Sequence, residues 1–473
     1  MADINPDFSL YHLTLKQQSG SVGSIIGNFS GLQKSQEVVI ATQTSLQLWK
    51  FDKGTKAFKK ALFQNAFANI TNIAVYPTSS KDLILLVSDA GALTIVEYLA
   101  NKNKFHTLKN EIFYKTGVRR TSPIEYIASD LRGRAVMLGA IERTKLVFTI
   151  LQNGESNLVH VNSPIEMNRS DVLTFDMKAM DTGLENPIFA TIETEYSSPT
   201  QKLLNYYEFD LGLNHVMLLE SETIRHSSNH IIPVPGGVHG PSGIFLCSEG
   251  MIQYKCPFKP THYVPIPTRA GNSNLRSFIV ASVVHKMKNG FFCLAQNQFG
   301  DIFKIIIDFL SPQERSFDIM DERESGPGMV TSITVKYFDT IPVCKSLLIL
   351  KSGFLLADCE AGDRHVYQFE KLGDGDDNEW NSQDYPDELS VMEEEIKNLV
   401  FETKSLENIV LVNSNTMLHP MVEMKLSDGD FINNLPELYS LTGSKANSAV
   451  KILHNSIQLS EIVTQDLPSK ILG

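Results

Sequence analysis

The chain repeats one pattern of hydrophobic and polar positions: an apolar run, a polar or glycine-containing turn, and a second run in which apolar and polar residues alternate. Residues 83–98, with the sequence LILLVSDAGALTIVEY, show it clearly. A turn of this kind between two such runs predicts a β-hairpin. Helical repeats would instead place apolar residues at i, i+3, i+4 and i+7. The pattern therefore predicts strands.

The predicted hairpin occurs seven times. The units start at Ala41, Ser88, Gly139, Ala190, Cys247, Ala295 and Ala357, at spacings of 47, 51, 51, 57, 48 and 62 residues. A period of about 40–60 residues with several short strands is typical of β-propellers, whose sheets pack radially because one four-stranded sheet cannot bury both faces alone. The Gly-His and Trp-Asp signatures of the most common propeller repeat are absent. We therefore predict an all-β chain in which residues 1–372 form a divergent seven-bladed propeller.

The period ends at a strongly acidic segment. Residues 373–396 carry ten acidic residues and no basic one. Such a segment repels itself, so we expect residues 373–399 to form an exposed linker or loop without stable secondary structure over most of its length. Strand-like runs such as NIVLVNS and ELYSLTGSKANSAVKILHNS follow. Residues 400–473 are accordingly predicted to be the start of a second, incomplete β-propeller.

Composition and charge limit the function. The 473 residues are 42% hydrophobic and 20% charged, which is typical of a soluble globular protein with a sizeable core. The formal charge of −12 argues against unaided binding to a phosphate backbone, so any RNA contact is expected to be indirect. No run approaches the ~20 apolar residues of a membrane span, and no signal peptide is recognisable. The five cysteines are interpreted as buried, reduced thiols in an intracellular protein.

Candidate catalytic and metal sites favour structural interpretations. His226 and His230 have the i, i+4 spacing of a zinc-binding helix, but the required Glu is missing and the flanking sequence is not helical. The glycine-rich residues 235–243, PGGVHGPSG, lack the Lys-Ser/Thr of a phosphate loop, and Ser242 does not fit G-x-S-x-G. A tight turn is the favoured interpretation of that segment. We expect no catalytic residue, cofactor or metal site, and no enzymatic activity.

One group of basic residues stands out in this acidic chain. Lys115, Arg119 and Arg120 surround Gly117, and Arg132 and Arg134 follow not far on. Solvated loop charge is one interpretation. The other is a docking site for an acidic partner or a phosphate, because Arg offers a rigid fork of donors to such groups. The turn-like connection is expected to reach a rim of the propeller.

Several long segments resemble, in order, the family of splicing factor 3b subunit 3. They are FSLYHLTLKQ, IIGNFSG, VSDAGALTIVEY, GRAVMLGAIERTKLVF, YEFDLGLNHV, VPGGVHGPSGIFLCSE, FFCLAQNQFGDIFKI and VKYFDTIPVCKSLLILKSGFLLA. The wider superfamily includes the large damaged-DNA-binding protein and the largest cleavage and polyadenylation specificity subunit. Its other members resemble these segments less closely, DLGLNH and KYFDTIPV in particular.

The resemblance implies a nuclear, non-enzymatic scaffold of three seven-bladed propellers and a helical C-terminal part. Such a subunit holds together the branch-site-recognising particle of the U2 snRNP by contacting the largest, HEAT-repeat subunit and small companion subunits. This chain would contain the first propeller and only the opening strands of the second. No membrane or small-molecule substrate is implied.

Two alternatives stay open. One is an adaptor in DNA-damage recognition and ubiquitin ligation, or in mRNA 3′-end processing, which shares the architecture. The other is an enzyme or small-ligand propeller, which would need convergent polar residues at the mouth of the central channel. Fold alone cannot separate these functions, whereas copurifying partners can.

Overall fold

The computed structural model describes most of the chain between residues 20 and 453. The described residues are 20–32, 35–52, 54–55, 57–66, 68–112, 115–116, 120–121, 123–142, 145–152, 159–167, 171–271, 275–288, 290–310, 329–373, 379–396, 399–415, 421–427, 437–442 and 449–453. Two compact units result, one formed by residues 20–416 and one that includes the strands after residue 417.

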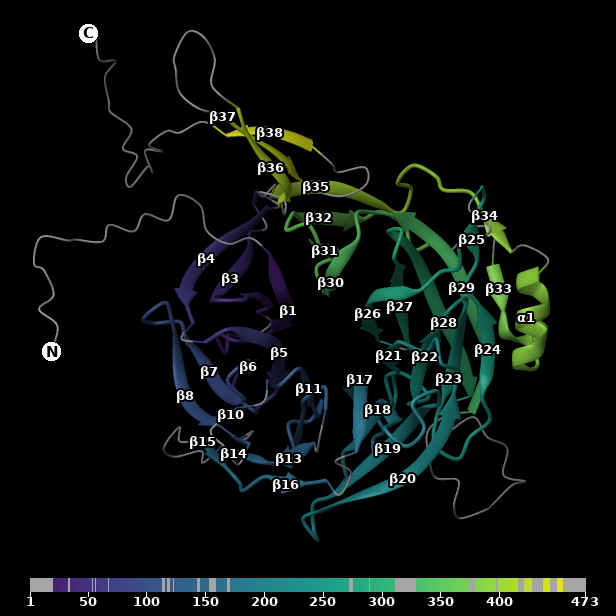
Figure 1. Cartoon of the computed structure of the whole chain (residues 1–473), viewed down its shortest axis with the longest axis horizontal. Coiled ribbons are helices and arrows are strands. Elements are labelled where there is room, and N and C mark those ends of the chain that lie inside the picture. Colours follow the sequence, from purple (N-terminus) through teal and green to yellow (C-terminus); the bar gives the residue numbers. More distant parts are fainter. Residues whose placement is uncertain are drawn as a thin grey trace, which may run out of the picture. The chain divides into compact units, whose positions relative to one another are not determined.

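Seven antiparallel sheets build the larger unit, and Figure 1 shows them as blades around one axis with the first strand of each blade innermost. Blades one and two contain β1 (Ser21–Gly27), β2 (Glu37–Thr42), β3 (Ser45–Asp52) and β4 (Ala57–Asn65), then β5 (Ile70–Tyr76), β6 (Leu83–Ser88), β7 (Ala92–Leu99) and β8 (Lys104–Ile112). Blades three and four contain β11 (Tyr126–Ser129), β12 (Val136–Gly139), β13 (Leu146–Phe148) and β16 (Ile165–Glu166), then β17 (Val172–Ala179), β18 (Ile188–Glu195), β19 (Lys202–Asp210) and β20 (His215–Ile224).

The remaining three blades follow in chain order. Blade five contains β21 (His230–Pro233), β22 (Ile244–Ser248), β23 (Met251–Lys255) and β24 (His262–Pro265). Blade six contains β26 (Ile279–Met287), β27 (Gly290–Asn297), β28 (Asp301–Leu310), β29 (Met329–Thr340) and β33 (Glu379–Asn381). Blade seven contains β30 (Cys344–Leu350), β31 (Phe354–Cys359), β32 (Arg364–Phe369) and β35 (Ile409–Asn415). The predicted all-β, seven-bladed propeller is confirmed, and each predicted hairpin is the second and third strand of a blade.

The second strand of each blade forms much of the core. β6 and β31, for example, are buried along their whole length. Neighbouring blades cover both faces of a blade, so these strands are continuous apolar runs with no polar face. The third strands reach further out and alternate more. This difference explains why each repeat unit has one apolar run and one alternating run.

The antiparallel order gives the ring two distinct faces. At one end, which we call the start face, the innermost strands begin and the turns between second and third strands lie. There several of these turns meet the segment leading into the next blade: the N–H of Ile70 donates to Gln43 O, that of Ile124 to Ser88 O, and that of Ile341 to Gly300 O. At the other end, the end face, lie the turns between first and second strands and between third and fourth strands.

The ring closes by packing between blades one and seven. Ser24 Oγ on β1 lies 2.5 Å from Ser346 Oγ on β30. Apolar side chains of β2 and β3 share one core cluster with those of β30 and β31. The buried Arg364 guanidinium also lies 5.5 Å from the centroid of the Trp49 ring. In the part that the structure describes, no strand is exchanged between the two blades, so these side-chain contacts hold the closure.

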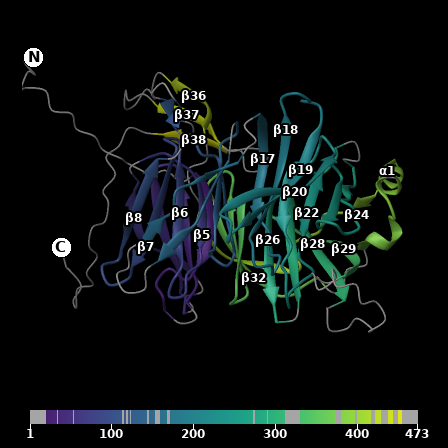
Figure 2. The same ribbon diagram turned by 90° about the horizontal axis from the view of Figure 1, so that it is seen from below.

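The acidic segment is structured, and our prediction that it lacks secondary structure is wrong. Its elements are β33, the 3-10 helix η2 (Ser382–Asp384) and the helix α1 (Glu388–Ile396), followed by β34 (Val400–Phe401). We call residues 379–396 and 399–408 the strap. β33 pairs with the outer edge of β29. Figure 2 shows α1 beside β24, which it contacts. The strap therefore covers the outer strands of blades five and six.

Spaced apolar residues hold the strap despite its charge. Tyr385 and Val391 are buried against Met251 of β23, and Trp380 packs on the core of blades five and six. Burial of these side chains outweighs the repulsion among carboxylates that stay in solvent. β35 then returns to complete blade seven, so strands of the propeller continue past residue 372 as far as Asn415.

Four small sheets complete the described fold. β9 (Lys115–Thr116) pairs with β10 (Arg120–Thr121), β14 (Ile150–Gln152) with β15 (Val159–Val161), and β25 (Thr268–Arg269) runs parallel to β34. In the smaller unit, β36 (Met421–Ser427), β37 (Glu437–Thr442) and β38 (Ala449–Leu453) form an antiparallel three-stranded sheet. Among the described residues, no helix has the length and apolar character that crossing a bilayer requires.

Candidate partner-binding surface

The basic residues that the sequence singles out lie in the connection between blades two and three. Lys115 begins β9 and Arg120 begins β10, with Arg120 opposite Thr116 and Thr121 opposite Lys115. Arg119 lies outside the described residues. Because this hairpin leads from the outermost strand of one blade to the innermost strand of the next, the topology puts it on the start face.

The structure does not bring the second basic pair to this hairpin. Arg132 and Arg134 lie in the turn between β11 and β12, which belongs to the end face. Arg134 is also committed internally, because Nε and Nη2 donate to the buried Asp130 carboxylate at 2.8 and 2.7 Å. The start-face hairpin must therefore act by itself if it binds a carboxylate or phosphate.

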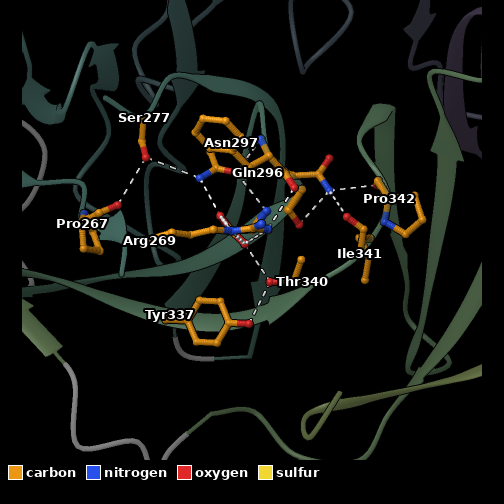
Figure 3. Close-up of polar contacts among 12 residues, drawn as sticks. Pro267, Arg269, Ser277, Gln296, Asn297, Tyr337, Thr340, Ile341 and Pro342 are labelled. Atoms are coloured by element: carbon orange, nitrogen blue, oxygen red, sulfur yellow. Dashed lines mark hydrogen bonds and ion pairs between the residues drawn. The ribbon is translucent and has the colours of Figure 1, made fainter. Parts of the chain in front are cut away.

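A buried polar cluster lies on the start face of blade six (Figure 3). Its centre is the fully buried Asp301, the first residue of β28, directly after the turn between β27 and β28. Arg269 donates from Nε to both carboxylate oxygens at 3.0 and 2.9 Å and from Nη2 to Oδ1 at 2.6 Å. Thr340 Oγ1 donates to Oδ1 at 2.7 Å, and Asn297 Nδ2 donates to Oδ2 at 3.0 Å. All acceptor directions of the carboxylate are therefore occupied, which makes it a structural group.

This cluster fixes the strap to the ring. Arg269 belongs to β25, which pairs in parallel with β34 of the strap, and the N–H of Thr268 donates to Leu399 O at 2.9 Å. Phe401 of β34 enters the core of blades five and six, where its ring stacks on Tyr337 at 4.6 Å between centroids. Charge pairing thus holds β25, and aromatic packing holds its partner strand β34.

The same turn joins blade six to blade seven. Gln296 Nε2 donates to Pro342 O at 3.1 Å, and its Oε1 accepts the N–H of Cys344, the first residue of β30, at 2.8 Å. Further along, Asp339 accepts the N–H groups of Asn408 and Ile409, where the strap returns to blade seven. These side chains therefore position strands.

The histidines of the candidate metal motif take different roles. His230 begins β21, where its Nε2 lies 3.0 Å from Ser282 Oγ and its Nδ1 lies 3.5 Å from Asp176 Oδ2. Burial lowers the pKa of His230, so it is neutral near pH 7. Burial also opposes ionisation of Asp176, but Lys178, His230 and two backbone N–H groups outweigh it, and the Asp176 pKa lies below its ordinary value. These contacts join blades four, five and six.

A second buried ion pair joins blades three and four. Lys145 Nζ lies 2.6 Å from Glu193 Oε1, and both side chains are almost fully buried. Glu193 also accepts Asn205 Nδ2 at 2.7 Å and the Tyr207 hydroxyl at 3.0 Å. Burial opposes the charge, but Lys145 outweighs it and holds the Glu193 pKa below its usual range. From the sequence alone, Glu193 and Glu195 in TIETEY indicate one solvated strand face, and for Glu193 this interpretation is wrong because its side chain is buried in this ion pair.

Two other sequence interpretations are confirmed. All five cysteines are buried free thiols. Residues 234–243 form the turn between β21 and β22, as expected for PGGVHGPSG, because the N–H of Ser242 donates to Pro235 O at 2.9 Å and that of Val234 to Gly243 O at 3.0 Å. Within the described ranges, no three His, Cys, Asp or Glu side chains are grouped so that they could hold a metal ion.

Comparisons with known proteins agree with this architecture. Residues 22–414 match the family model described as the RSE1/DDB1/CPSF1 first beta-propeller. The chain is 36% identical to the pre-mRNA-splicing factor rse1 of Emericella nidulans over 97% of its own length, and 39% identical to RSE1 of Debaryomyces hansenii over 98%. It is 35% identical to splicing factor 3B subunit 3 of Danio rerio over 97%.

These relatives are much longer than this chain, which spans 38%, 37% and 37% of their respective lengths. The match nevertheless begins in β1 and ends in β35, so its limits agree with those of the seven blades. The blade count agrees with the family match over residues 22–414, and the relatives are similar along almost the whole chain. The chain therefore belongs to the RSE1/DDB1/CPSF1 first-propeller family.

Proposed function

We propose that this chain provides the first propeller of a nuclear, non-enzymatic scaffold subunit of splicing factor 3b and acts in pre-mRNA splicing through protein contacts. The observation that carries the proposal is that relatives named as splicing factors match 97–98% of the chain at 35–39% identity. Scaffold behaviour is supported by the buried charges: Asp301, Asp176 and Glu193 all serve to join blades.

The partners follow from the same resemblance. We propose the large HEAT-repeat subunit and small subunits of splicing factor 3b within the U2 snRNP, with RNA contacted only indirectly because the chain carries a formal charge of −12. Lys115, Arg119 and Arg120 are proposed to dock an acidic partner segment. The position of Lys115 and Arg120 between two blades on the start face supports this role, since the connection that contains them joins β8 to β11.

A pull-down with matched charge reversals tests the proposal. Arg119→Glu/Arg120→Glu should reduce recovery of the HEAT-repeat subunit by about tenfold or more, because losing one side of a desolvated ion pair costs ~2–5 kcal/mol. The control Lys102→Glu/Lys104→Glu makes the same charge change at exposed residues of the β7–β8 turn on the end face. It should recover the partner like wild type, and neither variant should change the melting temperature appreciably.

The outcome separates the candidate functions. Copurification of U2 RNA and the HEAT-repeat subunit supports the splicing scaffold, whereas a cullin or polyadenylation factors would favour the alternative adaptors. If Arg119→Glu/Arg120→Glu recovers the partner normally, the basic residues of the hairpin are ordinary solvent-exposed charges and not a docking site. The proposed splicing function would not be affected by that result.

We also propose that β36–β38 are the inner strands of a blade in a second propeller. Four innermost strands of the first propeller, β1, β5, β26 and β30, carry a register shift at their start, for example between Ile70 and Asn72 in β5 and between Ile279 and Ala281 in β26. β36 carries the same shift between Met421 and Glu423. Such bulges increase the twist of a strand and change the direction of its side chains. Because β36 has its bulge at the same position as these innermost strands, we propose that it is the innermost strand of a blade.

A further inference from the structure

Four neighbouring loops on the end face expose apolar side chains although their backbones are firmly held. The loops are the β11–β12, β17–β18, β21–β22 and β26–β27 turns of blades three to six. Their exposed apolar residues are Leu131 (51% exposed), Leu184 (47%), Val238 (80%) and Met287 (39%). We call these four residues the end-face patch. Single exposed apolar residues are ordinary, but one on each of four adjoining loops requires an explanation.

Direct contacts make the loops neighbours. Arg134 of the first loop donates from Nη1 to Leu184 O of the second at 2.7 Å and also to Glu185 O. Lys286, at the end of β26, pairs with Asp181 of the second loop at 2.6 Å. His239 Nδ1 of the third loop lies 2.9 Å from Met287 O. The four loops are therefore neighbours across blades three to six, each with one exposed apolar side chain.

Close backbone approaches hold the loops rigid. At Gly133 (φ 67°), a Cβ would lie 2.2 Å from Pro77 O, and the Tyr76 hydroxyl donates to Gly133 O at 2.5 Å. At Gly236 a Cβ would lie 2.1 Å from Asp181 O. The glycines of PGGVHGPSG thus permit loop packing and leave Val238 extended into solvent. A surface fixed in this way loses little conformational entropy when it binds, so it is prepared for a partner.

Charge around the patch indicates the chemistry of that partner. The charged residues of these loops are Asp130, Arg132, Arg134, Asp181, Glu185, His239, Lys286 and Lys288. Asp130 and Asp181 pair with Arg134 and Lys286, which leaves Glu185 as the exposed carboxylate beside exposed Arg132 and Lys288. Positive charge around an apolar centre is unusual in a chain with a formal charge of −12.

We propose that the end-face patch binds a protein segment that presents leucine-type side chains flanked by carboxylates. The apolar side chains would pack on Leu131, Leu184, Val238 and Met287, while the carboxylates would lie near Arg132 and Lys288. Apolar contact at the centre with charged groups at the rim is the usual composition of a specific protein interface. The inference concerns the face opposite the basic hairpin and does not depend on the splicing assignment.

A labelled peptide tests this chemistry directly. The probe is a fluorescein-labelled amphipathic peptide of about 20 residues with a leucine face and glutamates elsewhere, titrated with the whole 473-residue chain by fluorescence anisotropy. Replacing its leucines by glutamine, or its glutamates by lysine, should weaken binding by about tenfold or more. Leu184→Asp/Val238→Asp in the protein should have the same effect. The control Leu275→Asp/Leu389→Asp alters residues that are 53% and 68% exposed in other parts of the unit and should bind like wild type.

Three results would overturn the proposal. They are equal binding by Leu184→Asp/Val238→Asp and its control, tighter binding of the lysine peptide, and no saturable binding of the leucine–glutamate peptide. Sedimentation of the chain alone is a fourth test, which measures self-association. Self-association that Leu184→Asp/Val238→Asp abolishes would assign the patch to a second copy of this chain and so contradict an acidic partner. Both variants should melt like wild type, since the changed side chains are exposed.

Discussion

Replacing Phe401 by alanine should release the strap from a ring that stays folded. Phe401 is 2% exposed, stacks on Tyr337 at 4.6 Å between centroids and lies edge-on to Phe303 at 5.6 Å. It is the apolar part of a two-residue strand whose other contacts are the backbone bonds to β25. The aromatic ring is therefore the main apolar contribution that holds this end of the strap.

The expected loss of stability follows from burial. Truncating a fully buried Phe to Ala costs ~3–5 kcal/mol, because the lost transfer free energy adds to that of the cavity. Here the loss of stability cannot exceed the free energy with which the strap docks on the blades, because the strap can detach locally while the blades stay folded. We expect the docking free energy of the strap to fall by about 3 kcal/mol and the unfolding free energy of the ring to change much less.

The two tryptophans of the chain separate these events. Trp380 lies on β33 of the strap, and Trp49 lies on β3 of blade one. With Trp49→Phe as background, Trp380 fluorescence reports the strap during urea unfolding, and with Trp380→Phe as background, Trp49 reports the ring. Phe401→Ala should move the Trp380 transition to lower urea, ahead of the Trp49 transition. The control Val400→Ala, at a residue of the same strand that is 43% exposed, should shift either transition by less than ~0.5 kcal/mol.

Two results would refute this reasoning. If Phe401→Ala has no larger effect than Val400→Ala, the ring of Phe401 does not hold the strap. If both tryptophans report the same shift, the strap and the blades unfold as one cooperative unit, and the strap is then a structural layer of the propeller.

Three further predictions rest on other contacts. Asp301→Asn should lower the unfolding free energy by about 3 kcal/mol, measured by urea denaturation, because it leaves the Arg269 charge without its carboxylate; Arg269 is 28% exposed, so water limits the loss. The pKa of His230 is lowered below its ordinary 6.5, so its neutral form stabilises the fold above that pH and the contribution falls as pH drops below it. The melting temperature of His230→Asn should accordingly fall less than that of wild type between pH 7 and about 5.5, whereas an identical slope would show that His230 does not contribute. Removing residues 417–473 should leave the Trp49 unfolding transition unchanged, since they belong to the other compact unit; a shift of more than ~1 kcal/mol would show that the two units are coupled.

The sequence predicts the blades well because hairpins are local. Turn residues such as those at Asp89 and Gly91 lie beside the strands that they connect, and the period of the units counts the sheets without any long-range information. The second strands add to this signal, because burial on both faces requires continuous apolar runs. Fold class and blade number therefore follow from patterns that span a few residues.

The strap and the polar clusters could not be predicted in this way, because they depend on long-range pairing. Phe401 meets Tyr337 and Arg269 meets Asp301 across separations that no local pattern records. The ten acidic residues of 373–396 predict a solvated segment. The spaced apolar residues Trp380, Tyr385 and Val391 were the signal that this segment packs on the blades. Similarly, glycines of PGGVHGPSG predict a turn, whereas the exposure of Val238 depends on the neighbouring loop.

The arrangement of covered and uncovered surfaces limits where partners can bind. The strap covers the outer strands of blades five and six, so those strands are not open to a partner. The start face carries the basic hairpin of Lys115 and Arg120, and the end face carries an apolar patch with a positive rim. Both would attract carboxylates, but salt should distinguish them. Binding at the hairpin is electrostatic and is screened at high ionic strength, while apolar burial at the end face persists. A partner that stays bound in high salt should therefore be lost with Leu184→Asp/Val238→Asp, and one released by salt should be lost with Arg119→Glu/Arg120→Glu.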